Sequence, residues 1–114
     1  MTLSTNQLQS SNALPPETMN YYSALLLLQE KWVLFTIDAL MAGPLGFNDL
    51  SRRANCVINN TTLSQRLTLL EEHGIITRTV HRAIPPRTSY ALTEKGKAMN
   101  EIFEAIRKWS INTE

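Results

Sequence analysis

The fold of this chain is decided by residues 63–93, which read LSQRLTLLEEHGIITRTVHRAIPPRTSYALT. Leu63, Leu67 and Leu70 recur at positions i, i+4 and i+7. This spacing places the three side chains on one stripe of an α-helix, and such an apolar stripe must pack on a core. The sequence therefore predicts a helix over residues 59–73 that is held to the body of the protein by its leucines.

A β-hairpin is predicted directly after this helix. Gly74 is a typical helix stop, and residues 75–82 and 87–92 are rich in residues that favour strands. The Pro85-Pro86 pair has no backbone N–H to donate to a strand ladder, so it belongs at the tip between the strands. A helix followed by a strand, a turn and a returning strand is the plan of a winged helix.

The free face of the predicted helix is polar and largely uncharged. At about 100° per residue, Thr61, Gln65 and Thr68 lie opposite the leucines, and Ser64 lies beside them. Gln, Ser and Thr side chains can pair with base edges in the DNA major groove, and a Thr methyl can contact a thymine methyl. A protein-binding surface more often has an apolar or aromatic centre. This face therefore favours DNA recognition.

Positive charge is concentrated around this helix. The chain as a whole has a formal net charge of +1, which argues against a strongly basic nucleic-acid-binding protein. Between residues 52 and 87, however, six arginines face two glutamates, so this segment has a net charge of +4. Such an uneven distribution gives a domain one basic face. The arginines are Arg52, Arg53, Arg66, Arg78, Arg82 and Arg87.

Two helices are predicted ahead of this region. The first follows Pro15-Pro16, and the second covers residues 31–41, is largely buried and ends at Gly43-Pro44. The apolar side of the first helix consists of Tyr21, Tyr22, Leu25 and Leu28.

A helix-turn-helix is predicted in the middle of the chain. Residues 46–54 form a short helix with Asn48 as its N-cap, and Asn59 or Asn60 caps the helix at 59–73. From spacing alone, two packed helices without a DNA-binding role remain the alternative.

A final helix is predicted from its cap at Thr93 to about Trp109. Its apolar stripe consists of Met99, Ile102, Phe103, Ile106 and Trp109. A terminal helix with so much apolar surface needs a partner.

Length and composition limit the number of domains and the class of protein. With 114 residues, of which 43% are hydrophobic, the chain suffices for one domain with a core. We expect a flexible polar arm at residues 1–16 and the domain at residues 17–114. No run of about 18 apolar residues is present, so no membrane span is expected. The single cysteine, Cys56, excludes an internal disulfide framework and agrees with a reducing cytoplasm.

Catalysis finds little support in the sequence. His73 and His81 have no acidic or thiol partner at a metal-ligand spacing. There is no glycine-rich phosphate loop and no nucleophile accompanied by a base. We therefore expect no enzyme activity, no catalytic residue, no metal and no cofactor.

Several motifs follow one another in a characteristic order: Lys31-Trp32, Phe47-x-x-Leu50, Leu63-x-x-x-Leu67-x-x-Leu70-Glu71-x-x-Gly74, Arg78, Pro85-x-x-x-x-Tyr90-x-Leu92-Thr93-x-x-Gly96 and Trp109. With this combination, residues 21–109 resemble the HxlR family of prokaryotic winged-helix transcription regulators, which are related in fold to MarR-type repressors. The resemblance implies a mainly α fold with a small β-wing (α+β). It also implies a homodimer, joined through its N- and C-terminal helices, that regulates transcription from a pseudo-palindromic operator in double-stranded DNA. Such a protein would be cytoplasmic and associated with the nucleoid.

The same resemblance implies which residues contact DNA. The helix at 59–73 would lie in the major groove with its N-terminal residues nearest the bases, and a residue on its flank would face a phosphate. The wing would reach the backbone or the adjacent minor groove. For each residue, an ordinary solvated surface is the alternative. The expected contacts are Asn59, Asn60, Thr61, Thr62, Ser64, Gln65 and the flanking Arg66 in the helix, and His81, Arg82 and Arg87 in the wing.

The chain departs from the family pattern near its first helix. Members commonly have a Cys-Pro there, an oxidation sensor in some, but the matching place near Met19 has no thiol. The usual Gly-Gly ahead of Lys31-Trp32 is Gln29-Glu30, which is consistent with a longer first helix.

Cys56 gives a separate redox hypothesis. It lies three residues before the predicted helix at 59–73, where the N-terminus of that helix and nearby Arg52 and Arg53 favour a thiolate. A small buried hydrophobic residue is the alternative.

Two other functions remain open. One is a winged-helix adaptor that binds protein, and the other is DNA binding without regulation, as in plasmid partition or chromatin architecture. The sequence identifies no effector and no operator.

Overall fold

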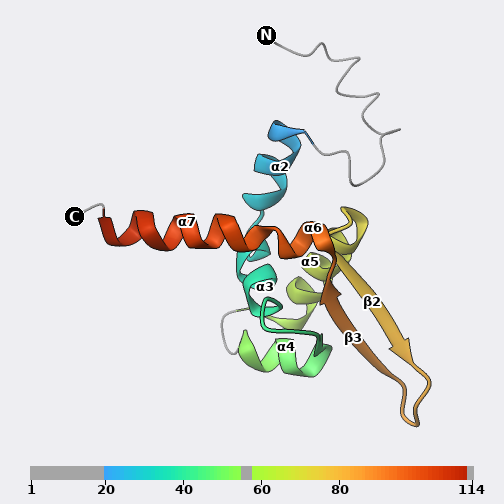
Figure 1. The fold of residues 1–114 in the computed structure, drawn as a ribbon. Helices are drawn as coiled ribbons and strands as arrows, with labels where there is room; N and C mark the ends of the chain where they lie inside the picture. The colour runs from blue at the N-terminus through green and yellow to red at the C-terminus, as the bar shows by residue number, and fades with distance from the viewer. Residues whose placement is uncertain (1–19, 55–57, 113–114) are drawn as a thin grey trace, which may run out of the picture.

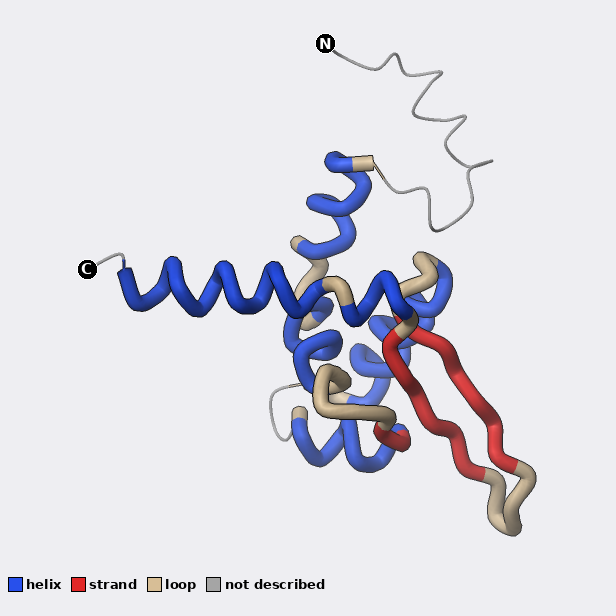
Figure 2. Tube along the Cα trace, in the orientation of Figure 1, coloured by secondary structure: helices blue, strands red, loops and turns tan. Residues whose placement is uncertain are grey.

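The computed structural model describes residues 20–54 and 58–112, and more than half of these residues are helical. A three-stranded antiparallel sheet has the order β1 (Leu45–Gly46), β3 (Arg87–Leu92), β2 (Ile76–His81). The β2–β3 hairpin and α7 (Met99–Asn112) extend from the body in different directions (Figure 1). Strands occupy little of the chain (Figure 2). The elements are α2 (Tyr21–Leu28), α3 (Val33–Ala39), β1 (Leu45–Gly46), α4 (Phe47–Arg53), α5 (Asn60–Glu72), β2 (Ile76–His81), β3 (Arg87–Leu92), α6 (Glu94–Lys97) and α7 (Met99–Asn112).

The leucine stripe of α5 lies at the centre of the core. Leu63, Leu67 and Leu70 are each exposed by 1% or less, and α5 packs against α3 and the start of β2. The helix begins after Asn59, whose side-chain oxygen accepts a hydrogen bond from Thr62 N at 2.8 Å. It stops before Gly74, whose φ of 73° suits a residue without a Cβ. The predicted helix, its stripe and its cap are therefore confirmed.

The hairpin has the predicted strands and tip. β2 and β3 pair from Ile76↔Leu92 at the base to His81↔Arg87 at the outer end. Ile76, Tyr90 and Leu92 are buried at the base, whereas β2 is exposed from Thr77 onward. The hairpin is therefore held by its base and extends as a wing.

Strand β1 differs from the prediction, which places residue 46 at the start of a helix. Leu45 pairs with Tyr90 and Gly46 pairs with Ser89. Gly46 is also the N-cap of α4, so the prediction of Asn48 as that cap is wrong. A two-residue strand is too short to show a period in sequence, and its pairing with β3 is a tertiary contact.

The turn between α2 and α3 also differs from the prediction. Helix α2 ends at Leu28 with Gln29 as its C-cap, so Gln29-Glu30 does not lengthen the helix. Trp32 has a φ of 74°, outside the helical region, and α3 therefore begins only at Val33. Phe35 is exposed, so α3 buries one face rather than its whole circumference.

Thr93 joins the wing to the C-terminal helices. Its hydroxyl donates to Gly74 O at 2.6 Å and accepts from Gly96 N at 3.2 Å, and its amide donates to Ile75 O at 2.9 Å. Thr93 is thus the predicted cap, but the helix that it begins is short. The chain forms α6 and then α7, with Ala98 between them, rather than one continuous helix.

Some sequence predictions fall on residues that the structure does not describe. The polar arm at residues 1–16, the position near Met19 and Cys56 all lie outside the described residues. Within the ranges 20–54 and 58–112, no helix is long and apolar enough to cross a membrane.

The close approach at Gly96 gives a stability prediction. A Cβ at this position would overlap Ile75 O and would lie 2.9 Å from Leu92 Cδ2, so the backbone would have to shift. We expect Gly96→Ala to lower the free energy of unfolding by about 1–3 kcal/mol, as overpacking does. Urea unfolding measures the change. Lys97→Ala, in the same helix but exposed, is the control and should change it by less than about 0.5 kcal/mol; equal stability of the two variants would contradict the packing described.

Candidate nucleic-acid interface

Helix α5 presents a polar face to solvent. Thr61, Ser64, Gln65 and Thr68 are exposed, because burial of the leucine stripe fixes the rotation of the helix about its axis. Thr62 is half-buried near the start of the helix. These uncharged groups can donate and accept hydrogen bonds, as base-edge recognition requires.

Asn59 and Asn60 both have structural partners. Asn59 caps α5, and the side-chain oxygen of Asn60 accepts a hydrogen bond from Ser51 Oγ at 2.7 Å. Ser51 belongs to α4, so Asn60 links the two helices of the helix-turn-helix. Their role as DNA contacts stays a prediction, whereas their role in holding the N-terminus of α5 is visible in the structure.

The wing presents its cationic side chains near its outer end. Arg82 and Arg87 are exposed, and neither forms an ion pair with another residue in the described part of the chain. His81 is also exposed, and its Nε2 lies 2.9 Å from Ser89 Oγ on the opposite strand. The sequence predicts these three residues on the wing, and the structure brings His81 and Arg87 together as a cross-strand pair.

A groove separates the wing from α4. Its volume is about 450 Å³, and Asn48 and Arg52 line one side while Arg87 and Thr88 line the other. Arg52 is paired with Asp49 on its own helix. No sequence pattern indicates this groove, because it depends on the pairing of β1 with β3.

The arginines around α5 differ in what they contact. Arg78 Nε lies 3.7 Å from a Glu71 carboxylate oxygen. Arg66 Nε donates to Lys31 O at 2.6 Å, and Arg66 Nη2 lies 3.8 Å from a Glu30 carboxylate oxygen. Part of the predicted positive charge is therefore engaged within the protein, which the sequence could not reveal because these partners are set by the fold.

Tyr90 is a buried ionisable residue at the base of the wing. Burial raises the pKa of the Tyr90 phenol above its ordinary value, against the opposing effect of Arg78. The phenol therefore stays neutral at neutral pH. Among residues 20–54 and 58–112, no group of three or more His, Cys, Asp or Glu side chains is placed to hold a metal ion.

The model of the HxlR-like helix-turn-helix family matches residues 27–113. The chain belongs to the HxlR family. It is 38% identical over 79 residues to an uncharacterized HTH-type transcriptional regulator of Methanothermobacter thermautotrophicus, a match that spans 69% of this chain and 60% of that protein. It is 34% identical over 88 residues to the HTH-type transcriptional regulator YodB of Bacillus subtilis, spanning 77% of this chain and 78% of YodB. The predicted class, a winged helix-turn-helix transcription regulator, is therefore confirmed.

Solved structures agree with this HxlR-family assignment. The reduced form of YodB superposes with a TM-score of 0.74 at 31% identity, over 84% of this chain and 95% of that chain. The regulator YtcD superposes with a TM-score of 0.75 at 29% identity, over 82% of this chain and 96% of that chain. YodB has also been solved in a quinone-bound form. For this HxlR-family chain, redox sensing by Cys56 stays a prediction.

The capping role of Asn59 can be separated from a role in base recognition. Loss of the cap in Asn59→Ala should lower the free energy of unfolding by about 1 kcal/mol, whereas Asn59→Ser should retain most of it. Thermal unfolding measures both. If Asn59 acts mainly as a cap, Asn59→Ser also keeps DNA affinity; stable Asn59→Ser protein with much weaker DNA binding would instead assign Asn59 to a base.

Proposed function

We propose that this protein is a sequence-specific transcriptional regulator that binds double-stranded DNA as a homodimer at a pseudo-palindromic operator. The observation that carries the proposal is the division of α5 into a fully buried leucine stripe and an exposed polar face. A helix held in this way can enter the major groove without rearranging the domain. Membership of a regulator family supports the same function. The protein would act in the cytoplasm, at the nucleoid.

The DNA contacts follow from the chemistry of the exposed groups. Thr61, Thr62, Ser64 and Gln65, together with the side-chain NH2 groups of Asn59 and Asn60, would face base edges. Arg82 and Arg87, with His81 beside them, would contact the phosphate backbone or the adjacent minor groove. In the groove between α4 and the wing, Arg87 would be the arginine that contacts a DNA backbone, because Arg52 is paired there with Asp49.

The dimer would be built from the terminal helices. Tyr21 is 72% exposed on α2, and Trp109 is 69% exposed on α7. On α7, Met99 and Phe103 are buried, but Ile102, Ile106 and Trp109 are exposed and leave an apolar face. The helix itself runs out from the body (Figure 1). A projecting helix with an uncovered apolar face gains little stability alone. A second copy of the chain would cover both helices.

Symmetry then fixes the geometry on DNA. Two α5 helices related by a two-fold axis would enter successive major grooves about 34 Å apart. Each would read one half-site, so the operator would be a pseudo-palindrome. Binding would weaken steeply with salt, because cations at the wings displace counterions from the phosphates.

Base recognition and phosphate contact can be told apart by mutation. Gln65→Ala should cost about 1–3 kcal/mol of binding free energy and relax the preference at one base position per half-site. Arg87→Ala should weaken binding to all sequences alike. It should also reduce the salt slope, the steepness with which the logarithm of the binding constant falls with the logarithm of the salt concentration, by about 0.9 for each phosphate that the arginine neutralises in the wild type. Titrations of operator and random DNA over a salt series measure both effects. Equal reductions in affinity for both DNAs in both variants would contradict the assigned roles.

The dimer has its own test. Trp109→Glu places a charge in the proposed interface but should leave the fold intact, because Trp109 is exposed within the protomer. We expect sedimentation velocity to give twice the chain mass of 12.9 kDa for the wild type and the single chain mass for this variant. Lys108→Glu, which adds an acid at the neighbouring exposed position, is the control and should stay dimeric. A wild-type protein that sediments as a monomer would contradict the proposed homodimer.

The alternative functions predict other results. An adaptor would show no sequence preference on DNA and would retain a protein partner after Gln65→Ala. An architectural or partition protein would give long, cooperative footprints instead of one short protected site.

A further inference from the structure

Arg66 links the recognition helix to a distant turn of the chain. It lies on α5, but its Nε donates to the carbonyl of Lys31 at 2.6 Å, 35 residues earlier in sequence. Its Nη2 also lies 3.8 Å from a carboxylate oxygen of Glu30, and the Arg66 side chain is only 20% exposed. The guanidinium is thus directed toward the protein, where two acceptors already engage it.

The turn that Arg66 contacts has an unusual backbone. Helix α2 ends at Leu28, and Trp32 adopts a left-handed conformation before α3 begins. The Trp32 carbonyl accepts bonds from the amide and the hydroxyl of Thr36, so it is engaged by α3. The preceding carbonyl, that of Lys31, is the one that receives the Arg66 donor. Arg66 therefore satisfies a carbonyl at the point where the chain changes direction.

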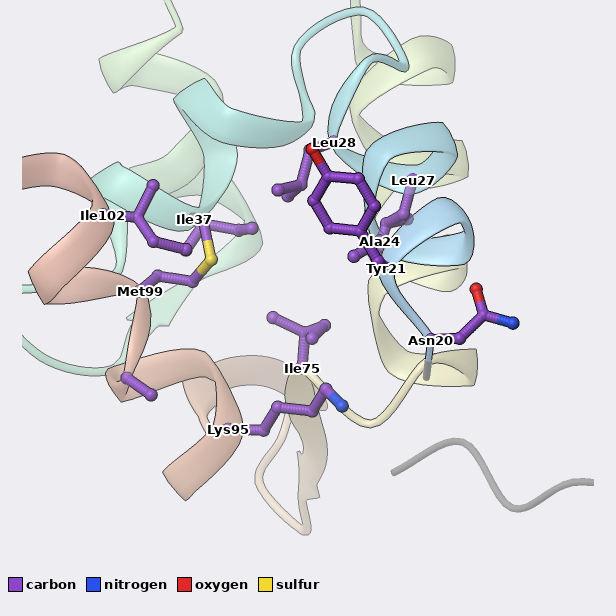
Figure 3. A pocket seen from close by; sticks show the side chains of 11 residues that line it. Asn20, Tyr21, Ala24, Leu27, Leu28, Ile37, Ile75, Lys95, Met99 and Ile102 are labelled. Carbon is purple, nitrogen blue, oxygen red and sulfur yellow. The ribbon is translucent and has the colours of Figure 1, made fainter. Parts of the chain in front are cut away.

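Helix α2 has few other attachments to the body. Leu27 is the buried residue of this helix, and Leu28 is half-buried. Between α2 and the C-terminal helices lies a hollow of about 280 Å³, bordered by Tyr21 on one side and by Met99 and Ile102 on the other (Figure 3). Because α2 does not pack closely on α7 within the protomer, its direction depends strongly on the turn at residues 29–32.

We propose that Arg66 is a positioning residue that fixes the direction of α2 relative to the recognition helix α5, and that it does not act as a phosphate contact. This inference rests on the proposed function, in which α2 joins the two protomers and α5 reads the operator. A link between these helices would set the separation of the two recognition helices in the dimer. The preferred spacing of half-sites would then depend on Arg66, although Arg66 touches no base.

Mutation can separate the effect of the positive charge of Arg66 from the effect of its planar guanidinium group. Arg66→Lys keeps the positive charge but removes the planar guanidinium that reaches Lys31 O and Glu30 together. A phosphate interaction would survive this change in large part, whereas the interaction with the turn would not. Arg66→Ala removes both, and Arg87→Ala shows for comparison how the removal of a phosphate-binding arginine behaves.

The first measurement uses operators whose half-site spacing is varied by one or two base pairs. We expect the wild type to have a sharp optimum, and both Arg66 variants to lose that optimum, with the ratio of operator to random-DNA affinity falling by about 2- to 30-fold. The salt slope of Arg66→Ala on random DNA should equal that of the wild type. If the Arg66 variants only destabilise the folded protein, their affinity should fall equally at every half-site spacing. That result would overturn the proposal. A salt slope reduced by about 0.9 in Arg66→Ala, together with wild-type DNA affinity in Arg66→Lys, would show that Arg66 contacts a phosphate and would also overturn the proposal.

The second measurement needs no DNA. Hydrogen exchange in the full chain should be faster across residues 21–33 in Arg66→Lys than in the wild type, and unchanged there in Arg87→Ala. Unchanged exchange in Arg66→Lys would overturn the proposal whether or not the protein binds an operator. A wild type that shows no sequence preference would instead refute the proposed function, with the exchange result still deciding whether Arg66 holds the turn.

Discussion

Burial of Leu63, Leu67 and Leu70 is the constraint on which the rest of the structure depends. Full burial of a leucine side chain contributes about 1.5–3 kcal/mol, so the three together strongly oppose any rotation of α5 about its axis. With the rotation fixed, Gln65 and Thr68 must face solvent. The surface proposed to read DNA is thus the other side of the protein's own core, and no mobile loop is needed to build it.

Local chemistry can be read from the sequence wherever a short pattern has one structural meaning. The leucine spacing, the cap at Asn59, the stop at Gly74 and the proline tip of the wing each depend on residues within a turn or two, and the structure has them all. Thr93 as a cap belongs to the same class. These local signals are sufficient to order a helix-turn-helix and a wing along the chain.

Features that depend on distant residues could not be predicted in this way. Strand β1 exists because Leu45 pairs with Tyr90, and the break ahead of α3 exists because Trp32 adopts a positive φ. The family resemblance implies a phosphate contact for Arg66, and no local pattern indicates that its guanidinium contacts a carbonyl 35 residues away. A net charge of +4 over residues 52–87 likewise overstates the cations left for DNA, since Asp49, which lies outside that segment, engages Arg52. Sequence periodicity carries no information about such partners.

A dimer that presents two α5 helices to two half-sites would protect one short site, and a footprint on genomic DNA would reveal it. Fragments of the source genome that bind the purified protein would be selected, and their protected regions would be mapped beside titrations against random DNA. We expect a short palindromic footprint with half-sites about one helical turn apart and binding at least about 10³-fold tighter than to random DNA. Weak binding without sequence preference, or long cooperative protection, would contradict the proposed function.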